Sequence, residues 1–180
     1  MPALSTHDSL LLAVDFQTAL LPAIHGHEAL LARALRLARA AQLVGVPVIA
    51  TEHCADKIGA TAAELRPQID HVIHKTHFDA TREHHFLHEL PRGKHRVLLI
   101  GTEAHVCVLQ TGLGLARLGL SPVLVTDCIG SRSPSDHAAA CDRWADNGLE
   151  RISAEMAMFE WLDSPAHPQF RDMLALVKAV

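Results

Sequence analysis

Short apolar runs recur along the chain, and each is bounded by a polar residue, a proline or a glycine. They cover residues 10–14, 46–50, 97–100 and 122–126. Uninterrupted apolar runs of this length, without polar alternation, are typical of strands that are buried on both faces, as in a parallel sheet. Two weaker runs, at 70–76 and 150–154, predict two further strands.

The segments between these runs carry apolar residues at helical spacing. They predict helices over about 28–43, 81–90, 106–118 and 134–147, and two further helical stretches at 156–162 and 167–180. Ser133 is placed as an N-cap, with Pro134 at the first helical position. Strands that alternate with helices in this way predict one α/β domain over residues 1–180. We expect a doubly wound, Rossmann-like, three-layer α/β/α fold with a mostly parallel sheet.

Composition narrows the classes of function. The 180 residues are 49% hydrophobic and 20% charged, and the formal net charge of −4 gives no basic surface for nucleic acid or an anionic membrane. No apolar run approaches the roughly 20 residues of a membrane-spanning helix, and the N-terminus lacks a secretory pattern. The four cysteines form no CxxC pair, which predicts reduced thiols and a cytoplasmic location. Neither a GxGxxG nor a GxxxxGK[ST] motif follows a strand, so no nucleotide cofactor is expected.

Three predicted strands end near a reactive or charged residue. Asp15 follows the run 10–14, Lys75 ends the run 70–76, and Cys107 comes soon after the run 97–100, near the start of a helix. Because parallel strands share one carboxyl edge, these side chains are expected to converge there, where open α/β sheets bind ligands. A helix N-terminus and a lysine both favour a thiolate, so a lowered Cys107 pKa is expected.

Together these three groups would make a coherent nucleophilic site. Cys107 would attack, Asp15 would accept and later return the proton, and Lys75 would hold the carboxylate and support the thiolate. Each residue also has a structural interpretation: a buried core cysteine, a turn aspartate and a solvated lysine. The coincidence of all three favours the catalytic interpretation.

The same segments resemble the isochorismatase-like cysteine hydrolases, a family that includes nicotinamidases and N-carbamoylsarcosine amidases. The resemblance covers nearly the whole chain and runs through VDFQ, PVIATEH, HKTHF, GTEAHVCVLQT and VLVTDCIGSRSPSDH. It implies a catalytic triad of Asp15, Lys75 and Cys107, a small-molecule substrate and a homo-oligomer. It also implies a cis peptide bond at Thr102–Glu103 and an oxyanion hole formed by the backbone N–H groups of Glu103 and Cys107.

The resemblance is incomplete where nicotinamidase relatives bind a metal. The chain has Thr51-Glu52-His53-Cys54 there, which does not reproduce the Asp-x-His ligand set. Glu52 and His53 could ligate a metal with His74 or His77. Hydrogen bonding around a pocket is the favoured interpretation, so no metal is expected. The residues expected to line the substrate pocket are Phe16, Gln17, Glu52, His53 and Phe78.

Three functions remain open from the sequence. The leading hypothesis is an amidase-like cysteine hydrolase that cleaves a small amide-type C–N bond through a Cys107 thioester. The second is a vinyl-ether hydrolase of the isochorismatase type. The third is a binding protein on the same fold in which Cys107 is a redox-sensitive thiol. Arg132, in the Ser-Arg-Ser segment, is expected either to hold its turn by an ion pair or to be solvated.

Overall fold

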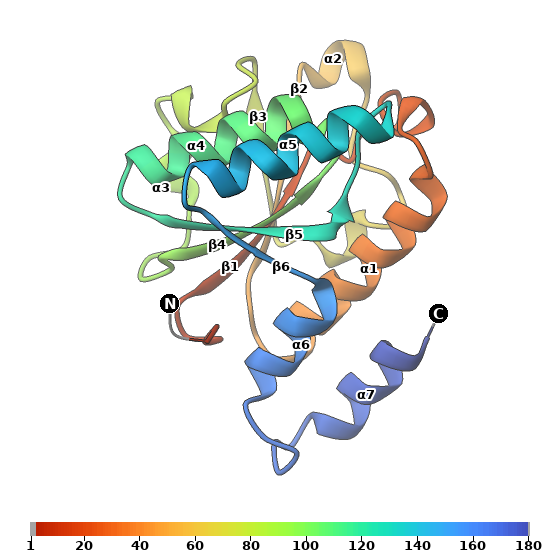
Figure 1. The fold of residues 1–180 in the computed structure, drawn as a ribbon, viewed down its shortest axis with the longest axis vertical. Coiled ribbons are helices and arrows are strands. Elements are labelled where there is room, and N and C mark those ends of the chain that lie inside the picture. The colour runs from red at the N-terminus through yellow and green to blue at the C-terminus, as the bar shows by residue number, and fades with distance from the viewer. Residues whose placement is uncertain (1–2, 180) are drawn as a thin grey trace.

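The chain folds around a six-stranded parallel sheet, as the apolar runs predict (Figure 1). The computed structural model describes residues 3–179. Residues 1, 2 and 180 of the predicted domain lie outside the described part, and residue 180 is also the end of the helical stretch predicted at 167–180. The strand order is β3-β2-β1-β4-β5-β6, and every pairing is parallel. The chain winds outward from β1 to β3 and then returns to the other side of β1. This reversal creates a topological switch point between β1 and β4.

The elements follow one another in the expected alternation. The strands are β1 (Ser9–Val14), β2 (Val48–His53), β3 (His71–Lys75), β4 (Arg96–Gly101), β5 (Ser121–Ile129) and β6 (Glu150–Ile152). The α-helices are α1 (His27–Leu43), α2 (Ala55–Ile58), α3 (Phe86–Glu89), α4 (Leu109–Arg117), α5 (Pro134–Asp146), α6 (Ala154–Leu162) and α7 (Phe170–Lys178). Short 3-10 turns lie at Leu21–Ala23, Arg66–Gln68 and η3 (Ala80–Arg82), and a π-helical turn, η4, covers Ala104–Val108.

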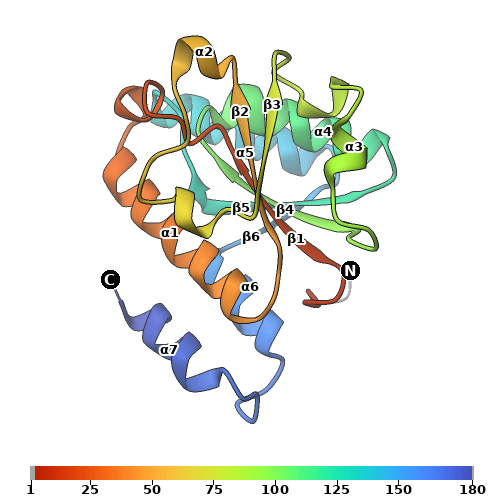
Figure 2. The ribbon, with the colours of Figure 1, turned by 180° about the vertical axis from the view of Figure 1, so that it is seen from behind.

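Helices cover both faces of the sheet and divide the core in two. Helices α1, α6 and α7 lie on one face, and α3, α4 and α5 lie on the other (Figures 1 and 2). Along β1 the side chains alternate between these cores: Leu11 and Ala13 face one, whereas Leu10, Leu12 and Val14 face the other. Burial on both faces explains why the sequence of β1 has no polar alternation. Within residues 3–179, no helix is both long and apolar enough to cross a bilayer.

Two predicted elements differ from the structure. The single helix expected over 81–90 is instead the 3-10 turn η3 followed by the one-turn helix α3. Two carboxylates near the start of this segment explain the break. Asp79 and Glu83 accept hydrogen bonds from nearby backbone N–H groups and so stabilise tight turns there. The helix expected over about 106–118 begins two residues earlier, as the π-helical turn Ala104–Val108 that contains Cys107. The start at Ser133 and Pro134 is confirmed, and the Ser133 hydroxyl accepts from the Asp136 N–H.

Helices α4 and α5 pack closely because a glycine faces a tryptophan. Trp144 of α5 is fully buried, and its Nε1 donates to the Glu150 carbonyl at 2.8 Å. A Cβ atom on Gly112 of α4 would lie 2.1 Å from the Trp144 ring. We therefore expect Gly112→Ala to lower the free energy of unfolding by about 1–3 kcal/mol, through overpacking.

Urea unfolding followed by circular dichroism would measure this change. Gln110→Ala, on the exposed face of the same helix, is the matched control and should leave stability nearly unchanged. Equal stability of the Gly112→Ala variant and the wild type would contradict the packing argument.

Candidate active site

A fully buried ion pair joins the ends of β1 and β3. The Lys75 Nζ lies 2.7 Å from Asp15 Oδ2, and both side chains have 0% exposure. The ammonium also donates to the carbonyls of His77 and Phe78, at 3.3 and 3.5 Å. Two charges removed from water need this kind of support, because desolvation otherwise offsets their attraction. The structure thus brings Asp15 and Lys75 together at the predicted sheet edge.

Asp15 is fixed by its backbone as well as by its charge. Its φ of 54° lies in the left-handed region, which aspartate adopts more readily than most residues. Its Oδ1 accepts from the Thr51 hydroxyl at 2.7 Å, and its carbonyl accepts from the Thr102 hydroxyl at 2.6 Å. These bonds tie the end of β1 to both neighbouring strands. Sequence reasoning missed Thr51, whose one available signal is its place at the end of an apolar strand.

Cys107 lies on the π-helical turn that follows β4, beside the ion pair. Its side chain is nearly buried, at 4% exposure. Burial raises the pKa of Cys107 to about 12; the Asp15 carboxylate adds to this effect, and the Lys75 ammonium opposes it. The expected lowering of this pKa is therefore wrong. Loss of hydration outweighs the favourable lysine, and the balance favours the thiol over the thiolate.

The turn between β4 and Cys107 is made without a cis peptide bond. Every peptide bond in the described residues is trans, so the cis bond expected at Thr102–Glu103 is wrong. Glu103 turns the chain with a left-handed φ of 53°. The N–H groups of Ala104 and Val106 donate to the carbonyls of Gly130 and Glu103, at 2.7 and 2.8 Å.

Arg132 holds this turn by an ion pair, one of the two roles expected for it. Its guanidinium donates to Glu103 Oε2 at 3.0 Å, although its own side chain is 59% exposed. His105 lies in the same cluster, with Nδ1 2.9 Å from the Ser131 hydroxyl. The Ser-Arg-Ser segment therefore braces the backbone next to Cys107.

The five expected pocket residues divide into two groups. Phe16 is buried in the core, and Gln17 is a structural link: its amide bonds to backbone groups of His53 and Gly59. Glu52 is also buried, and its Oε1 accepts from the Thr61 N–H and hydroxyl. The rings of His53 and Phe78 lie 5.3 Å apart, and Phe78 is half exposed. These two rings are therefore the members of the set best placed to meet a ligand.

The residues considered as metal ligands are engaged in other contacts. His74 Nδ1 lies 3.6 Å from Glu52 Oε2, and His77 Nδ1 lies 2.9 Å from Glu83 Oε1. Across residues 3–179, no three histidine, cysteine, aspartate or glutamate side chains are grouped so that they could hold a metal ion. The four cysteines are free thiols.

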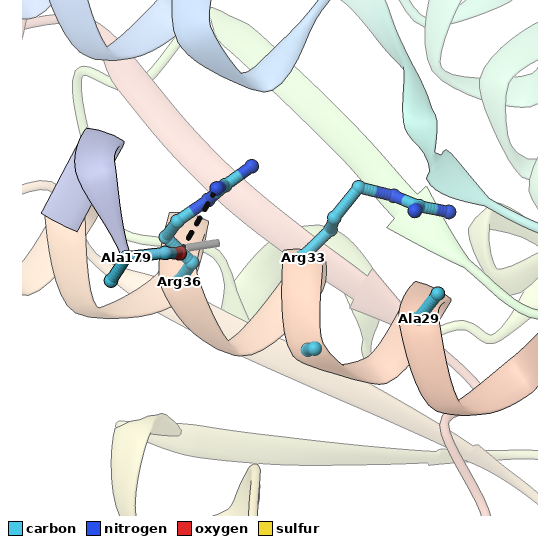
Figure 3. Close-up of a pocket in the computed structure, with 5 residues that line it drawn as sticks. Ala29, Arg33, Arg36 and Ala179 are labelled. Carbon is cyan, nitrogen blue, oxygen red and sulfur yellow. Dashed lines mark hydrogen bonds between the residues drawn. The ribbon is translucent and has the colours of Figure 1, made fainter.

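Cavities lie around the carboxyl edge of the sheet and elsewhere. One of about 420 Å³ reaches Lys75 and is bordered by Glu52, His74 and Glu83. Another, of about 220 Å³, lies away from the triad, where α1 meets the C-terminal end of α7. It is lined by alanines and by Arg33 and Arg36, and the Arg36 guanidinium donates to the Ala179 carbonyl (Figure 3).

Comparison with known proteins places the chain in a family. Residues 9–156 match the family model of the isochorismatase domain. The chain belongs to the isochorismatase-domain family. It is 30% identical to the secreted isochorismatase effector Isc1 of Phytophthora sojae, over 96% of this chain and 85% of that protein.

Solved structures have the same fold as this isochorismatase domain. The MAR1 ribonuclease of Caenorhabditis elegans superposes with a TM-score of 0.91 at 26% identity, over 98% of this chain and 92% of that chain. YcaC from Pseudomonas aeruginosa, determined with hexane-2,5-diol and covalent acrylamide, has a TM-score of 0.89 at 23% identity, over 97% and 91% of the two chains. The three-layer α/β/α fold is thereby confirmed.

The buried pair predicts an asymmetry between single and double variants. Lys75→Met leaves the Asp15 carboxylate without its ammonium, which should lower the free energy of unfolding by about 3–5 kcal/mol. Asp15→Asn combined with Lys75→Met removes both charges and should recover a large part of this loss. Chemical denaturation of wild type, single and double variants at pH 7 tests the expectation. A double variant no more stable than Lys75→Met would contradict it.

Glu83 provides a pH-dependent contribution near the same strand. Burial alone would raise its pKa, but the N–H groups of His77 and Thr76 and their side chains lower it to about 2. A carboxylate whose folded pKa is depressed stabilises the protein above its unfolded pKa of 4.5 and loses that effect as pH falls towards 2. Glu83→Gln should therefore be less stable than wild type at pH 7, and the difference should shrink below about pH 4.5. Melting curves from pH 7 to 3 measure it, and a difference independent of pH would contradict the assignment.

Proposed function

We propose that this isochorismatase-domain protein is a cysteine hydrolase that cleaves a small amide-type C–N bond. The observation that supports this most directly is that the Cys107 thiol lies beside the fully buried Asp15–Lys75 ion pair. A thiol, an adjacent proton acceptor and a cation that orients that acceptor are the components that nucleophilic acyl transfer requires. Family membership supports the broader assignment as a hydrolase.

In the first half of the reaction, the sulfur attacks the substrate carbonyl carbon. A C–S bond forms while the thiol proton passes to Asp15, so the thiolate need not exist before substrate arrives. Burial raises the pKa of Cys107 to about 12, which makes proton transfer coupled to attack the favourable route. The C–N bond then breaks, Asp15 returns the proton to the departing nitrogen, and a thioester remains on Cys107.

In the second half, water resolves the thioester. Asp15 accepts a proton from the water as its oxygen attacks the acyl carbon. The C–S bond breaks, the sulfur takes up the proton, and the acid product leaves. Lys75 stays protonated throughout and keeps the carboxylate aimed at the reacting atoms. This cycle consumes water and no cofactor.

The developing oxyanion would be held at the turn before Cys107. The family resemblance implies this role for the backbone N–H groups of Glu103 and Cys107; those of Ala104 and Val106 are bonded to carbonyls. The Glu103–Arg132 ion pair braces the turn. One such donor contributes about 3–4 kcal/mol of transition-state stabilisation. The rings of His53 and Phe78 would meet the organic part of a small substrate.

Substitution of the nucleophile provides the decisive experiment. Cys107→Ala should abolish hydrolysis of any small amide identified by screening, and it should not accumulate an acyl adduct in intact-protein mass spectra. Cys54→Ala, at a half-buried cysteine outside the triad, is the matched control and should retain turnover.

The alternatives give different results in the same experiment. A vinyl-ether hydrolase would release product without a thioester and would retain turnover in Cys107→Ala. A binding protein with a redox thiol would show no turnover, yet its Cys107 would be oxidised reversibly. Homo-oligomerisation stays a prediction, which light scattering would check.

A further inference from the structure

The loop that holds the Lys75 ammonium is itself fastened to the helix that follows Cys107. Residues 77 and 78 supply the two carbonyls that accept from the ammonium. Helix α4 contacts the next part of this loop through Thr111, Gly114 and Arg117. Helix α4 continues directly from the turn that carries Cys107. This one helix therefore connects Cys107 with the loop whose carbonyls bind the Lys75 ammonium.

Thr111 occupies the centre of this connection. It is fully buried and lies four residues after Cys107, one helical turn along. Its hydroxyl accepts from the Ala80 N–H at 3.1 Å and donates to the Phe78 carbonyl at 3.4 Å. One hydroxyl therefore bonds to the loop on both sides of Asp79, and one of its bonds is to a carbonyl that faces Lys75.

Asp79 strengthens the same attachment. Its side chain is nearly buried and accepts from the Thr81 N–H and hydroxyl, at 2.9 and 2.6 Å. It also accepts from Arg117 of α4 at 2.8 Å. The loop lies so close to α4 that a Cβ on Gly114 would be 2.4 Å from Asp79 Oδ1 and 2.3 Å from Thr81 Oγ1. Because Gly114 has no side chain, it leaves the space that this loop occupies against α4.

We propose that Thr111 is a positioning residue which, through the Phe78 carbonyl and the docked loop 77–81, holds the Lys75 ammonium in register with Asp15 and Cys107. It touches neither the substrate nor the reacting atoms. Loss of its hydroxyl leaves the Ala80 N–H without its buried acceptor and removes one of the two donors to the Phe78 carbonyl, so the loop shifts and the ammonium follows. This inference rests on the proposed function, because it assumes that Lys75 supports the reactive sulfur.

The test needs no substrate. The rate of Cys107 alkylation by iodoacetamide at pH 9 is measured by peptide mass spectrometry, with Cys54 in the same sample as reference. Thr111→Val should slow Cys107 alkylation about three- to tenfold, equivalent to as much as one pKa unit. Thr111→Ser keeps the hydroxyl and should restore the rate. Gly114→Ala displaces the loop by a different route and should slow alkylation as well.

A matched control separates positioning from general loosening. Gly112→Ala perturbs α4 against Trp144, on a contact that does not involve the loop. It should lower stability and leave the Cys107 rate unchanged or faster. If Thr111→Val behaves like Gly112→Ala, or if Thr111→Ser fails to restore the rate, the positioning role is overturned.

A separate variant tests the part of the proposed function on which this inference rests. Lys75→Met should slow Cys107 alkylation at least as much as Thr111→Val, provided that circular dichroism shows a folded protein at the temperature used. An unchanged rate in folded Lys75→Met would overturn the premise that Lys75 supports the sulfur. A slowed rate in Lys75→Met with a wild-type rate in Thr111→Val would overturn the positioning role alone.

Discussion

The buried Asp15–Lys75 ion pair is the constraint on which the rest of the site depends. Two opposite charges with no exposed side-chain surface are stable together only when geometry and hydrogen bonds compensate for their lost hydration. The compensation comes from three segments of the chain, one of them strand β2. Thr51 bonds to the carboxylate, the carbonyls of residues 77 and 78 bond to the ammonium, and Thr102 fixes the Asp15 backbone. The pair therefore joins strand ends that are far apart in sequence.

Backbone strain gathers at the same edge. Three residues at the carboxyl ends of strands have positive φ angles. Asp15 directly follows β1, Cys54 directly follows β2, and Glu103 lies two residues after the end of β4. Each such residue costs of order 1–3 kcal/mol and persists where its surroundings impose the conformation. At Asp15 the left-handed turn aims a carboxylate across the sheet edge. At Glu103 it redirects the chain towards Cys107, and Gly101 makes this possible because a Cβ there would lie 2.6 Å from the Val14 carbonyl.

The fold and the triad could be predicted because they depend on local patterns. Apolar runs mark the strands, and the polar or reactive residues that follow them mark the shared edge, so the convergence of Asp15, Lys75 and Cys107 could be expected. The pKa of Cys107 could not be predicted, because it depends on how completely neighbouring loops exclude water. The contacts of Phe16 and Gln17 could not be predicted for a related reason. Both directly follow Asp15, but the sharp turn there sends one side chain into the core and the other onto backbone groups.

A protonated thiol beside a closed ion pair has a consequence for selectivity. With the thiol neutral and Asp15 balanced by Lys75, the three groups carry no net charge before reaction. Such a site gives an anionic group no electrostatic advantage, whereas an uncharged carbonyl enters without losing strong hydration. In the proposed reaction, attack by the sulfur would place negative charge on the carbonyl oxygen and a proton on Asp15, which would leave the Lys75 ammonium without its counter-ion. The ammonium that balances Asp15 at rest would then favour the proposed transition state, and that route would need no preformed thiolate.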